Sequence, residues 1–141
     1  MARRTQRRAV IFFRIRTAVR VLPDHVEIVC TGTYSRAEAL RVGREAYAEA
    51  NRGSRDAVLV DVRGINGRVP TILDRFEFGV GLARNYLDFD PRVRLAVLGH
   101  EPMIHPERFG ELVARNRGAD ARVFTDEAQA RDWLLARRSG R

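Results

Sequence analysis

The fold of this chain is decided by residues 57–68, with the sequence AVLVDVRGINGR. The first six of these residues are almost continuously apolar and rich in valine, which is typical of a strand covered on both faces by helices. Gly64 and Asn66-Gly67 then predict a break in the strand, and Pro70 favours the start of a helix. A strand, a Gly-rich turn and a helix place loop amides at the carboxyl edge of a sheet, where open α/β folds bind ligands.

The segment before this strand predicts an antiparallel hairpin. From Ile11 to Val21 most odd-numbered positions are apolar and arginines occupy alternate positions, which indicates a strand with an arginine-lined outer side. A turn over residues 22–25 leads to a second strand over 26–31. His25 is interpreted as a turn residue. Cys30, the only cysteine, falls on the inward side of the second strand, which favours a buried, unreactive thiol.

Helices and strands alternate through the rest of the chain. Ser35 and Glu38 form a capping-box pattern that opens a helix ending at Gly53. The further elements expected are a helix over 70–87, a strand over 93–99, a helix opened by His105-Pro106, a strand over 121–124 and a final helix capped at Thr125-Asp126. This order predicts one α/β domain with a mostly parallel sheet of about five strands, an N-terminal hairpin and four helices.

The helix expected over residues 70–87 carries two apolar stripes. The stripe assigned to the core comprises Leu73, Phe76, Val80, Ala83 and Leu87. The second comprises Phe78 and Leu82, with Phe89 beyond the helix end. A helix that is apolar on two sides needs a second cover. We therefore interpret Phe78, Leu82 and Phe89 as an interaction surface for a protein partner or a second copy of the chain, with a fit inside the chain as the alternative.

The net charge of +8 belongs to the ends of the chain. All 26 basic residues are arginines, of which seven lie in residues 1–20 and three in 137–141, so the body between them holds 16 arginines against 18 acidic residues. We expect residues 1–10 to be a basic flexible arm, residues 11–136 the domain and residues 137–141 a basic tail. The absence of lysine excludes a Walker-type phosphate loop, a Schiff-base enzyme and a protein-kinase core.

The size of the chain fits a single soluble domain. Its 141 residues and 45% hydrophobic content are enough for one core. The longest apolar run near the start, residues 9–13, is too short for a membrane span and is followed by no cleavage site. We therefore expect a cytoplasmic protein.

Polar residues near the expected strand ends are candidates for chemistry. Asp61 is either an acid or base with a pKa raised by burial or, as we favour, a strand-end carboxylate bonded to loop amides. The turn over residues 64–67 is a candidate anion cradle, although a plain turn is favoured. His100, Glu101 and His105 lack the spacing of a zinc-binding helix. No metal, cofactor or catalytic set is therefore predicted.

Two segments and the order of elements carry a family resemblance. The segment VDVRGI over residues 60–65 and the ending RVFTDEAQARDWL over residues 122–134 resemble the STAS-type, SpoIIAA-like domains. These are anti-sigma-factor-antagonist-like modules, some of them grouped with lipid-transfer (CRAL-TRIO-like) domains. The resemblance extends over about residues 12–136 and implies the SpoIIAA-like fold and a non-enzymatic regulatory role.

The chain departs from the resemblance where a helix follows the central strand. Phosphoswitch members of this family carry an Asp-Ser pair there, and phosphate added by a kinase controls partner binding. This chain has Arg68-Val69-Pro70-Thr71 instead. A phosphate on Thr71 would lie at a helix N-terminus beside Arg68, which is electrostatically favourable. An ordinary first-turn threonine is the favoured interpretation.

Three functional hypotheses follow. The first, which we prefer, is a regulatory or protein-interaction module. The second is a carrier of a small anionic molecule or lipid in the crevice at the carboxyl ends of the strands, with Arg63 or Arg68 holding the charge. The third is a nucleic-acid accessory protein that uses the arginines of residues 3–20. The candidate ligand-binding or regulatory residues are Asp61, Arg63, Gly64, Asn66, Arg68, Thr71, His100 and Thr125.

Overall fold

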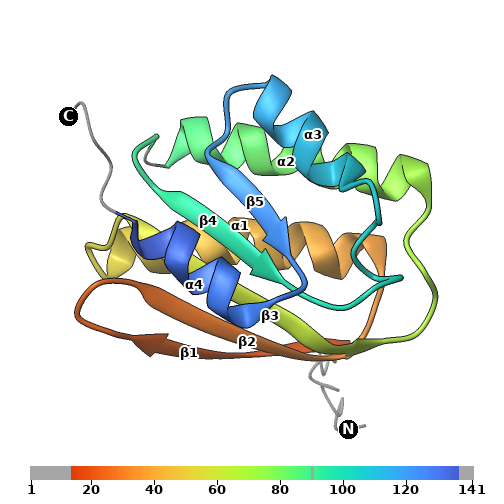
Figure 1. Cartoon of the computed structure of the whole chain (residues 1–141), viewed down its shortest axis with the longest axis horizontal. Helices are drawn as coiled ribbons and strands as arrows, with labels where there is room; N and C mark the ends of the chain where they lie inside the picture. The colour runs from red at the N-terminus through yellow and green to blue at the C-terminus, as the bar shows by residue number, and fades with distance from the viewer. Residues whose placement is uncertain (1–13, 90, 137–141) are drawn as a thin grey trace, which may run out of the picture.

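A five-stranded sheet and four helices make up the computed structural model, which describes residues 14–89 and 91–136 (Figure 1). The elements are β1 (Ile15–Val21), β2 (Val26–Thr33), α1 (Arg36–Arg52), β3 (Ala57–Asn66), α2 (Ile72–Asp88), β4 (Arg94–Leu98), α3 (Phe109–Asn116), β5 (Ala121–Phe124) and α4 (Glu127–Leu135). The strands lie side by side in chain order, β1 antiparallel to β2 and the others parallel. The predicted fold class is therefore confirmed. The predicted arm, the tail and Ile11 lie outside the described residues.

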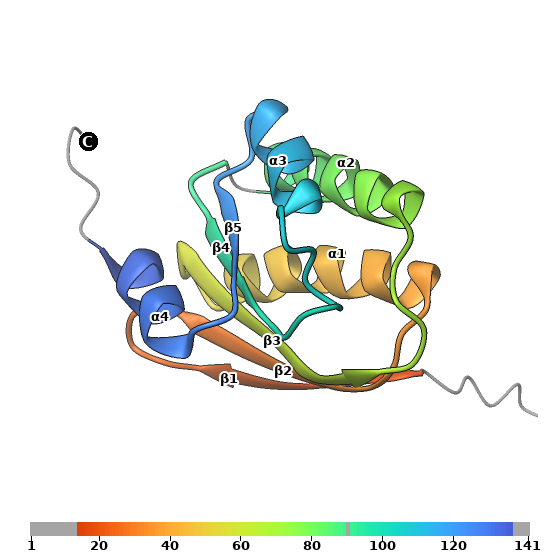
Figure 2. The ribbon, with the colours of Figure 1, turned by 45° about the vertical axis from the view of Figure 1, so that its right-hand side comes forward.

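The helices divide unequally between the two faces of the sheet. Helices α1, α2 and α3 lie on one face and α4 lies on the other (Figure 2). Strand β3 shows the division: Val58 and Val60 join the core beneath α1–α3, whereas Leu59 packs with Ala130 and Leu134 of α4. Each of these buried valine and leucine side chains contributes about 1.5–3 kcal/mol to folding. The prediction that this strand is covered on both faces is confirmed.

The α4 face is covered only over the second half of the sheet. Helix α4 contacts β3, β4 and β5, while the same face of β1 and β2 leaves Arg16, Ala18, Arg20 and Val29 exposed. This agrees with the arginine-lined outer side predicted for the first strand.

The end of β3 differs from the prediction. The strand continues through Gly64 to Asn66 and pairs with β2 across a register shift between Val29 and Thr31. A Cβ atom on Gly64 would lie 2.9 Å from the carbonyl oxygen of Cys30, so glycine is needed for close approach of two strands. The chain turns only at Gly67, where φ is +104°. The predicted strand break at Gly64 is wrong, and most of the expected anion-cradling turn is strand.

Two helices begin later than predicted. Helix α2 starts at Ile72, with Thr71 rather than Pro70 at its boundary. Helix α3 starts at Phe109 after Arg108, whose φ of 54° is left-handed, so His105-Pro106 belongs to the preceding loop. The N-caps predicted for the other two helices are confirmed: the side chain of Ser35 accepts from Glu38 N, and that of Asp126 accepts from Gln129 N. The predicted capping box of Ser35 and Glu38 is only half formed, because the Glu38 carboxylate accepts from Ile15 N and Arg41 instead.

Candidate functional site

The stripe predicted to be an interaction surface lies inside the protein. Leu82 belongs to the core, and Phe78 and Phe89 pack against it. The cover is helix α1: a Cβ atom on Gly43 would lie 3.2 Å from Leu82 Cδ2, so α1 approaches α2 closely over this stripe. Leu82 is therefore not part of an exposed surface, whereas Phe78 and Phe89 are partly buried, and their packing favours the alternative of a fit inside the chain.

Much of the stripe predicted to be core is exposed instead. The side chains of Ile72, Leu73 and Phe76 are 55, 60 and 38% exposed, and Val69, just before the helix, is 48% exposed. We call these four residues the α2 patch. The guanidinium of Arg117 lies over the Phe76 ring, 5.2 Å from its centroid. Leu87, at the other end of α2, is 64% exposed and stands apart from the patch in sequence.

The N-terminus of α2 is closed by a complete capping box. The Thr71 hydroxyl accepts a hydrogen bond from Asp74 N at 3.0 Å, and Asp74 Oδ2 accepts from Thr71 N at 3.1 Å and from Arg68 Nη1 at 2.8 Å. Burial would raise the pKa of Asp74, but these bonds and one from Tyr34 hold it below its ordinary value. The predicted pair of Thr71 and Arg68 is therefore brought together by one ionised carboxylate.

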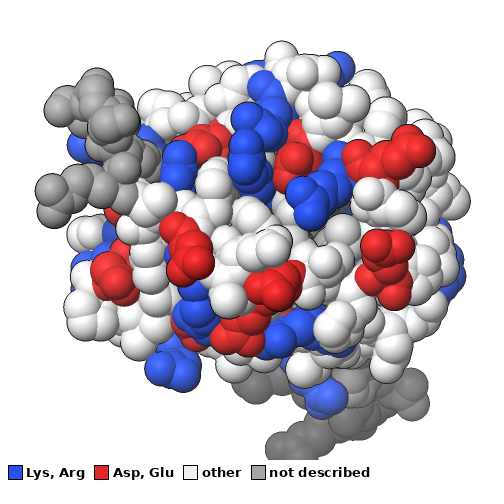
Figure 3. Space-filling model, in the orientation of Figure 1, with Lys and Arg blue, Asp and Glu red and all other residues white. Residues whose placement is uncertain are grey.

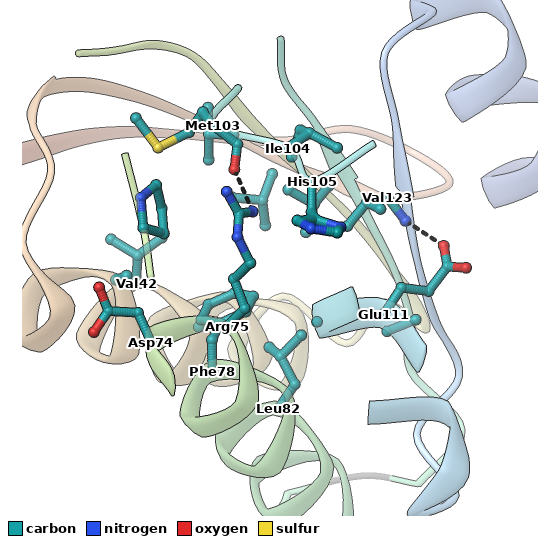
Figure 4. A pocket seen from close by; sticks show the side chains of 18 of the residues that line it. Val42, Asp74, Arg75, Phe78, Leu82, Met103, Ile104, His105, Glu111 and Val123 are labelled. Carbon is teal, nitrogen blue, oxygen red and sulfur yellow. Dashed lines mark hydrogen bonds between the residues drawn. The ribbon is translucent and has the colours of Figure 1, made fainter. Parts of the chain in front are cut away.

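An apolar cavity of about 120 Å³ lies between the sheet and helices α1, α2 and α3 (Figure 4). Its apolar lining includes Val42, Phe78, Leu82, Val97, Met103 and Ile104. The structure describes all eight ligand-binding or regulatory candidates from the sequence, and none of them lines the cavity. The cavity therefore differs from the predicted crevice at the carboxyl ends of the strands.

Arg75 enters this cavity from α2 and is only 9% exposed. Its Nη1 donates to Met103 O at 2.9 Å and its Nη2 donates to Pro102 O at 2.8 Å (Figure 4 draws the bond to Met103). Its Nε has no hydrogen-bond partner among the described residues. Burial lowers the pKa of Arg75, yet an arginine stays protonated in proteins, so the group remains a buried cation.

Charged side chains on the α4 face form one connected network. Arg63 pairs with Asp61 at 2.8 Å and with Glu127 at 3.0 Å, and Arg131 joins Glu127 to Glu27 at 2.9 and 2.5 Å. Acidic and basic side chains lie next to one another on the face seen in Figure 3, which does not show one broad basic patch. Opposite charges are thus matched locally on this side of the molecule.

Asp61 is a locally satisfied carboxylate. Burial would raise its pKa, but hydrogen bonds from the side chain and backbone of Arg63 keep the pKa below its ordinary value. The interpretation of Asp61 as an acid or base with a raised pKa is therefore wrong. The bonded strand-end carboxylate that we favoured agrees with these contacts, although its partner is Arg63, within the strand.

His25 lies between two carboxylates, an arrangement that the sequence interpretation did not predict. It is 4% exposed; its Nδ1 lies 2.7 Å from Asp24 Oδ1 and its Nε2 lies 2.9 Å from Glu27 Oε2. The bond to His25 is the main cause that lowers the pKa of Asp24. For Glu27, burial would raise the pKa, but bonds from Arg131 and His25 lower it. The sequence feature that could have predicted these contacts is Glu27, an acidic residue within a predicted strand and two residues after a histidine.

The remaining candidates fall at two places. The register aligns Asp61 with Leu98 and Phe124, so His100 and Thr125 follow at the same edge of the sheet as Asp61. Thr71 and Arg68 belong instead to the start of α2. His105 Nδ1 accepts from Glu107 N at 3.1 Å in the loop before α3.

Three further observations limit the chemistry of the described residues. In residues 14–89 and 91–136, His, Cys, Asp and Glu side chains form no group of three or more able to hold a metal. Over the same ranges, no helix combines the length and apolar character that crossing a membrane requires. Cys30 is fully buried, and burial raises the pKa of its thiol to about 12, so it is not a nucleophile at neutral pH.

Solved structures share this fold. The chain matches an anti-sigma factor antagonist from Mycobacterium paratuberculosis with a TM-score of 0.56 and 14% identity, over 85% of this chain and 93% of that one. An uncharacterised protein with a SpoIIAA-like fold from Shewanella loihica PV-4 matches with a TM-score of 0.47 and 15% identity, over 90 and 98%. SpoIIAA, an anti-sigma factor antagonist in its unphosphorylated form, matches with a TM-score of 0.48 and 12% identity, over 84% of this chain and 96% of that one.

Neither the protein-family models nor the curated proteins give a match to the sequence. The likeness to the Mycobacterium paratuberculosis protein confirms the anti-sigma-factor-antagonist type of fold that the sequence resemblance implied. At these identities the likeness concerns the fold.

Proposed function

We propose that this SpoIIAA-like domain is a non-enzymatic regulatory module that binds another protein through the α2 patch. The observation that supports the proposal is the exposure of Ile72, Leu73 and Phe76 in the first turns of α2, together with Val69 just before the helix. Single exposed apolar residues are ordinary on soluble proteins, whereas a group of large ones indicates an interaction site.

The charges beside the patch suggest the chemistry of the partner. Arg68, whose side chain is half exposed, directly precedes the patch, and Arg117 lies over Phe76. A complementary surface therefore has an apolar centre with acidic residues at its rim. The Mycobacterium paratuberculosis protein is an antagonist of an anti-sigma factor. A regulatory protein of this kind is the partner that we propose.

Thr71 is the residue through which this binding would be regulated. It is exposed and directly precedes Ile72 of the patch. A phosphate there would lie at a helix N-terminus and would compete with the Asp74 carboxylate for Arg68. A phosphate would also place a double negative charge against the acidic rim of the partner. We therefore expect Thr71→Glu to weaken partner binding, while Thr71→Ala costs about 1 kcal/mol of stability through loss of the cap.

The test compares two equally exposed leucines on the same helix. Immobilised wild-type protein, Leu73→Asp and Leu87→Asp are each incubated with a lysate of the native host, and the bound proteins are quantified by mass spectrometry. We expect a partner that wild type and Leu87→Asp retain and Leu73→Asp loses. The purified partner should then bind Leu73→Asp at least about tenfold more weakly.

Two results would contradict this proposal. A partner that Leu73→Asp retains as well as wild type would show that the patch is not the docking site. A wild-type dimer in sedimentation experiments that Leu73→Asp converts to a monomer would show that the patch serves self-association instead.

A further inference from the structure

Arg75 differs from the other arginines that lie against the sheet. Arg94 and Arg131 each form an ion pair with an acidic side chain, to Asp120 at 3.1 Å and to Glu27 at 2.5 Å. Arg75 is more deeply buried, yet among the described residues its hydrogen bonds go to two backbone carbonyls alone. A buried cation is normally paired, because removing it from water without a counter-ion is costly.

The guanidinium of Arg75 retains unused donors. It has five N–H groups. The bonds to Met103 O and Pro102 O use two of them, and Nε has no partner among the described residues. A carboxylate binds a guanidinium through two parallel hydrogen bonds, so the available donors suit such a group.

The acidic side chains that also line the cavity are already occupied. Asp74 accepts from Thr71 and Arg68 at the cap of α2. Glu111 Oε1 accepts from Val123 N at 2.8 Å, and Figure 4 shows its carboxylate directed at that amide. Neither carboxylate forms an ion pair with Arg75 among the described residues, so the nearby acids do not complete its coordination.

The cavity beside Arg75 has room for a small apolar body. Its volume of about 120 Å³ is close to the roughly 150 Å³ of an engineered apolar protein cavity that binds benzene. Val42, Phe78 and Leu82 supply an apolar wall opposite the sheet (Figure 4). Arg108 and Arg122 also line the cavity, but its exposed lining is mostly apolar, so a short hydrocarbon body is well matched to it.

We propose that this cavity binds a small organic carboxylate, with its charged group on Arg75 and a benzene-sized or short aliphatic body between α2 and the sheet. This site is separate from the α2 patch, because Arg75 lies on the inner side of the helix whose outer side carries the patch. A failure to bind a carboxylate would therefore leave the proposal of protein binding intact, and the reverse also holds.

The first test uses the wild-type protein alone. Binding of benzoate and of its neutral analogue benzyl alcohol is measured by titration with amide chemical shifts as the readout. We expect benzoate to bind at least about tenfold more tightly, with the largest shifts at residues 75–82 and 103–105. Equal binding of the two compounds, or no binding of benzoate at millimolar concentrations, would overturn the proposal.

The second test uses matched arginine variants on the same helix. Arg75→Met keeps an unbranched, flexible stem and removes the guanidinium, and Arg84→Met does the same at an exposed position. We expect Arg75→Met to lose the preference for benzoate while still binding benzyl alcohol, and Arg84→Met to behave as wild type. Benzyl alcohol binding verifies that the cavity of Arg75→Met is intact. Benzoate binding that survives Arg75→Met would place the site elsewhere.

Discussion

On the face of the sheet covered by α4, Arg131 connects two carboxylates, and the buried Glu27 among them also bonds His25. On the opposite face, beneath α1–α3, Arg75 is buried and forms no ion pair within residues 14–89 and 91–136. The two faces belong to the same sheet and both carry apolar cores. They differ in whether buried charge is matched within the chain.

This difference separates a structural role from a binding role. A matched network loses stability when one member is removed, because the others are left buried and unpaired. Removing a cation that has no ion-pair partner leaves no carboxylate unpaired. Its removal is therefore expected to change ligand binding more than the free energy of unfolding. The following predictions test that distinction.

The largest effect is expected at Glu27. Glu27→Leu removes the acceptor shared by His25 and Arg131, and leaving the buried His25 without this partner typically costs about 1–3 kcal/mol. Urea unfolding measures the loss. Glu77→Leu, which breaks an exposed pair with Arg36, is the control and should cost about 1 kcal/mol or less. An equal loss of unfolding free energy in the two variants would show that the Glu27 network is no more important for stability than an exposed ion pair.

A smaller effect on stability is expected when the pH is lowered. The pKa values of Glu27 and Asp61 are lowered in the folded protein, so the stability they contribute is present above their unfolded values and is lost as the pH falls through the folded ones. The free energy of unfolding should therefore decline as the pH falls below about 4.5, the ordinary value for Glu27. Glu27→Gln should flatten this decline. A decline unchanged in Glu27→Gln would show that other carboxylates cause it.

Arg75→Met is expected to change stability little. No carboxylate loses its partner, and the carbonyl oxygens of the exposed Pro102 and half-buried Met103 can bond water instead. The free energy of unfolding should stay within about 1.5 kcal/mol of wild type in either direction. A loss as large as that of Glu27→Leu, measured by the same urea unfolding, would show that Arg75 is a structural residue.

The smallest effect is expected at the exposed end of the α4 network. The Arg63 side chain is about one-third exposed, so its pairs with Asp61 and Glu127 are screened by water. Arg63→Gln should cost about 0.5 kcal/mol in urea unfolding. A cost of several kcal/mol would show that the network acts as one unit from Glu27 to Asp61.

The sequence predicted most of the fold, because the evidence for it is local. The apolar run over residues 57–62, the alternation of β1 and the caps at Ser35 and Asp126 each depend on residues close together in the chain. Their order implied a mostly parallel sheet with a hairpin, and the structure has it. The family resemblance led to the same fold.

The candidate site was predicted much less well. Helix α2 has apolar residues on two sides, and periodicity alone does not say which side meets the sheet. Gly43 decides the matter by letting α1 cover Phe78 and Leu82, which leaves Leu73 and Phe76 in solvent. The environment of His25 was missed because its partner Glu27 is held by Arg131, which lies 104 residues from Glu27 in the sequence.

By itself, the sequence determined the class of fold, the order of its elements and the buried strand at its centre, since hydrophobic periodicity and capping act over a few neighbouring residues. The tertiary structure alone decided that Arg75 meets an apolar cavity and that the α2 patch faces outward. Both depend on how closely α1, α2 and α3 pack against one another and the sheet. That packing brings together residues that are far apart in the sequence, so a local sequence pattern does not predict it.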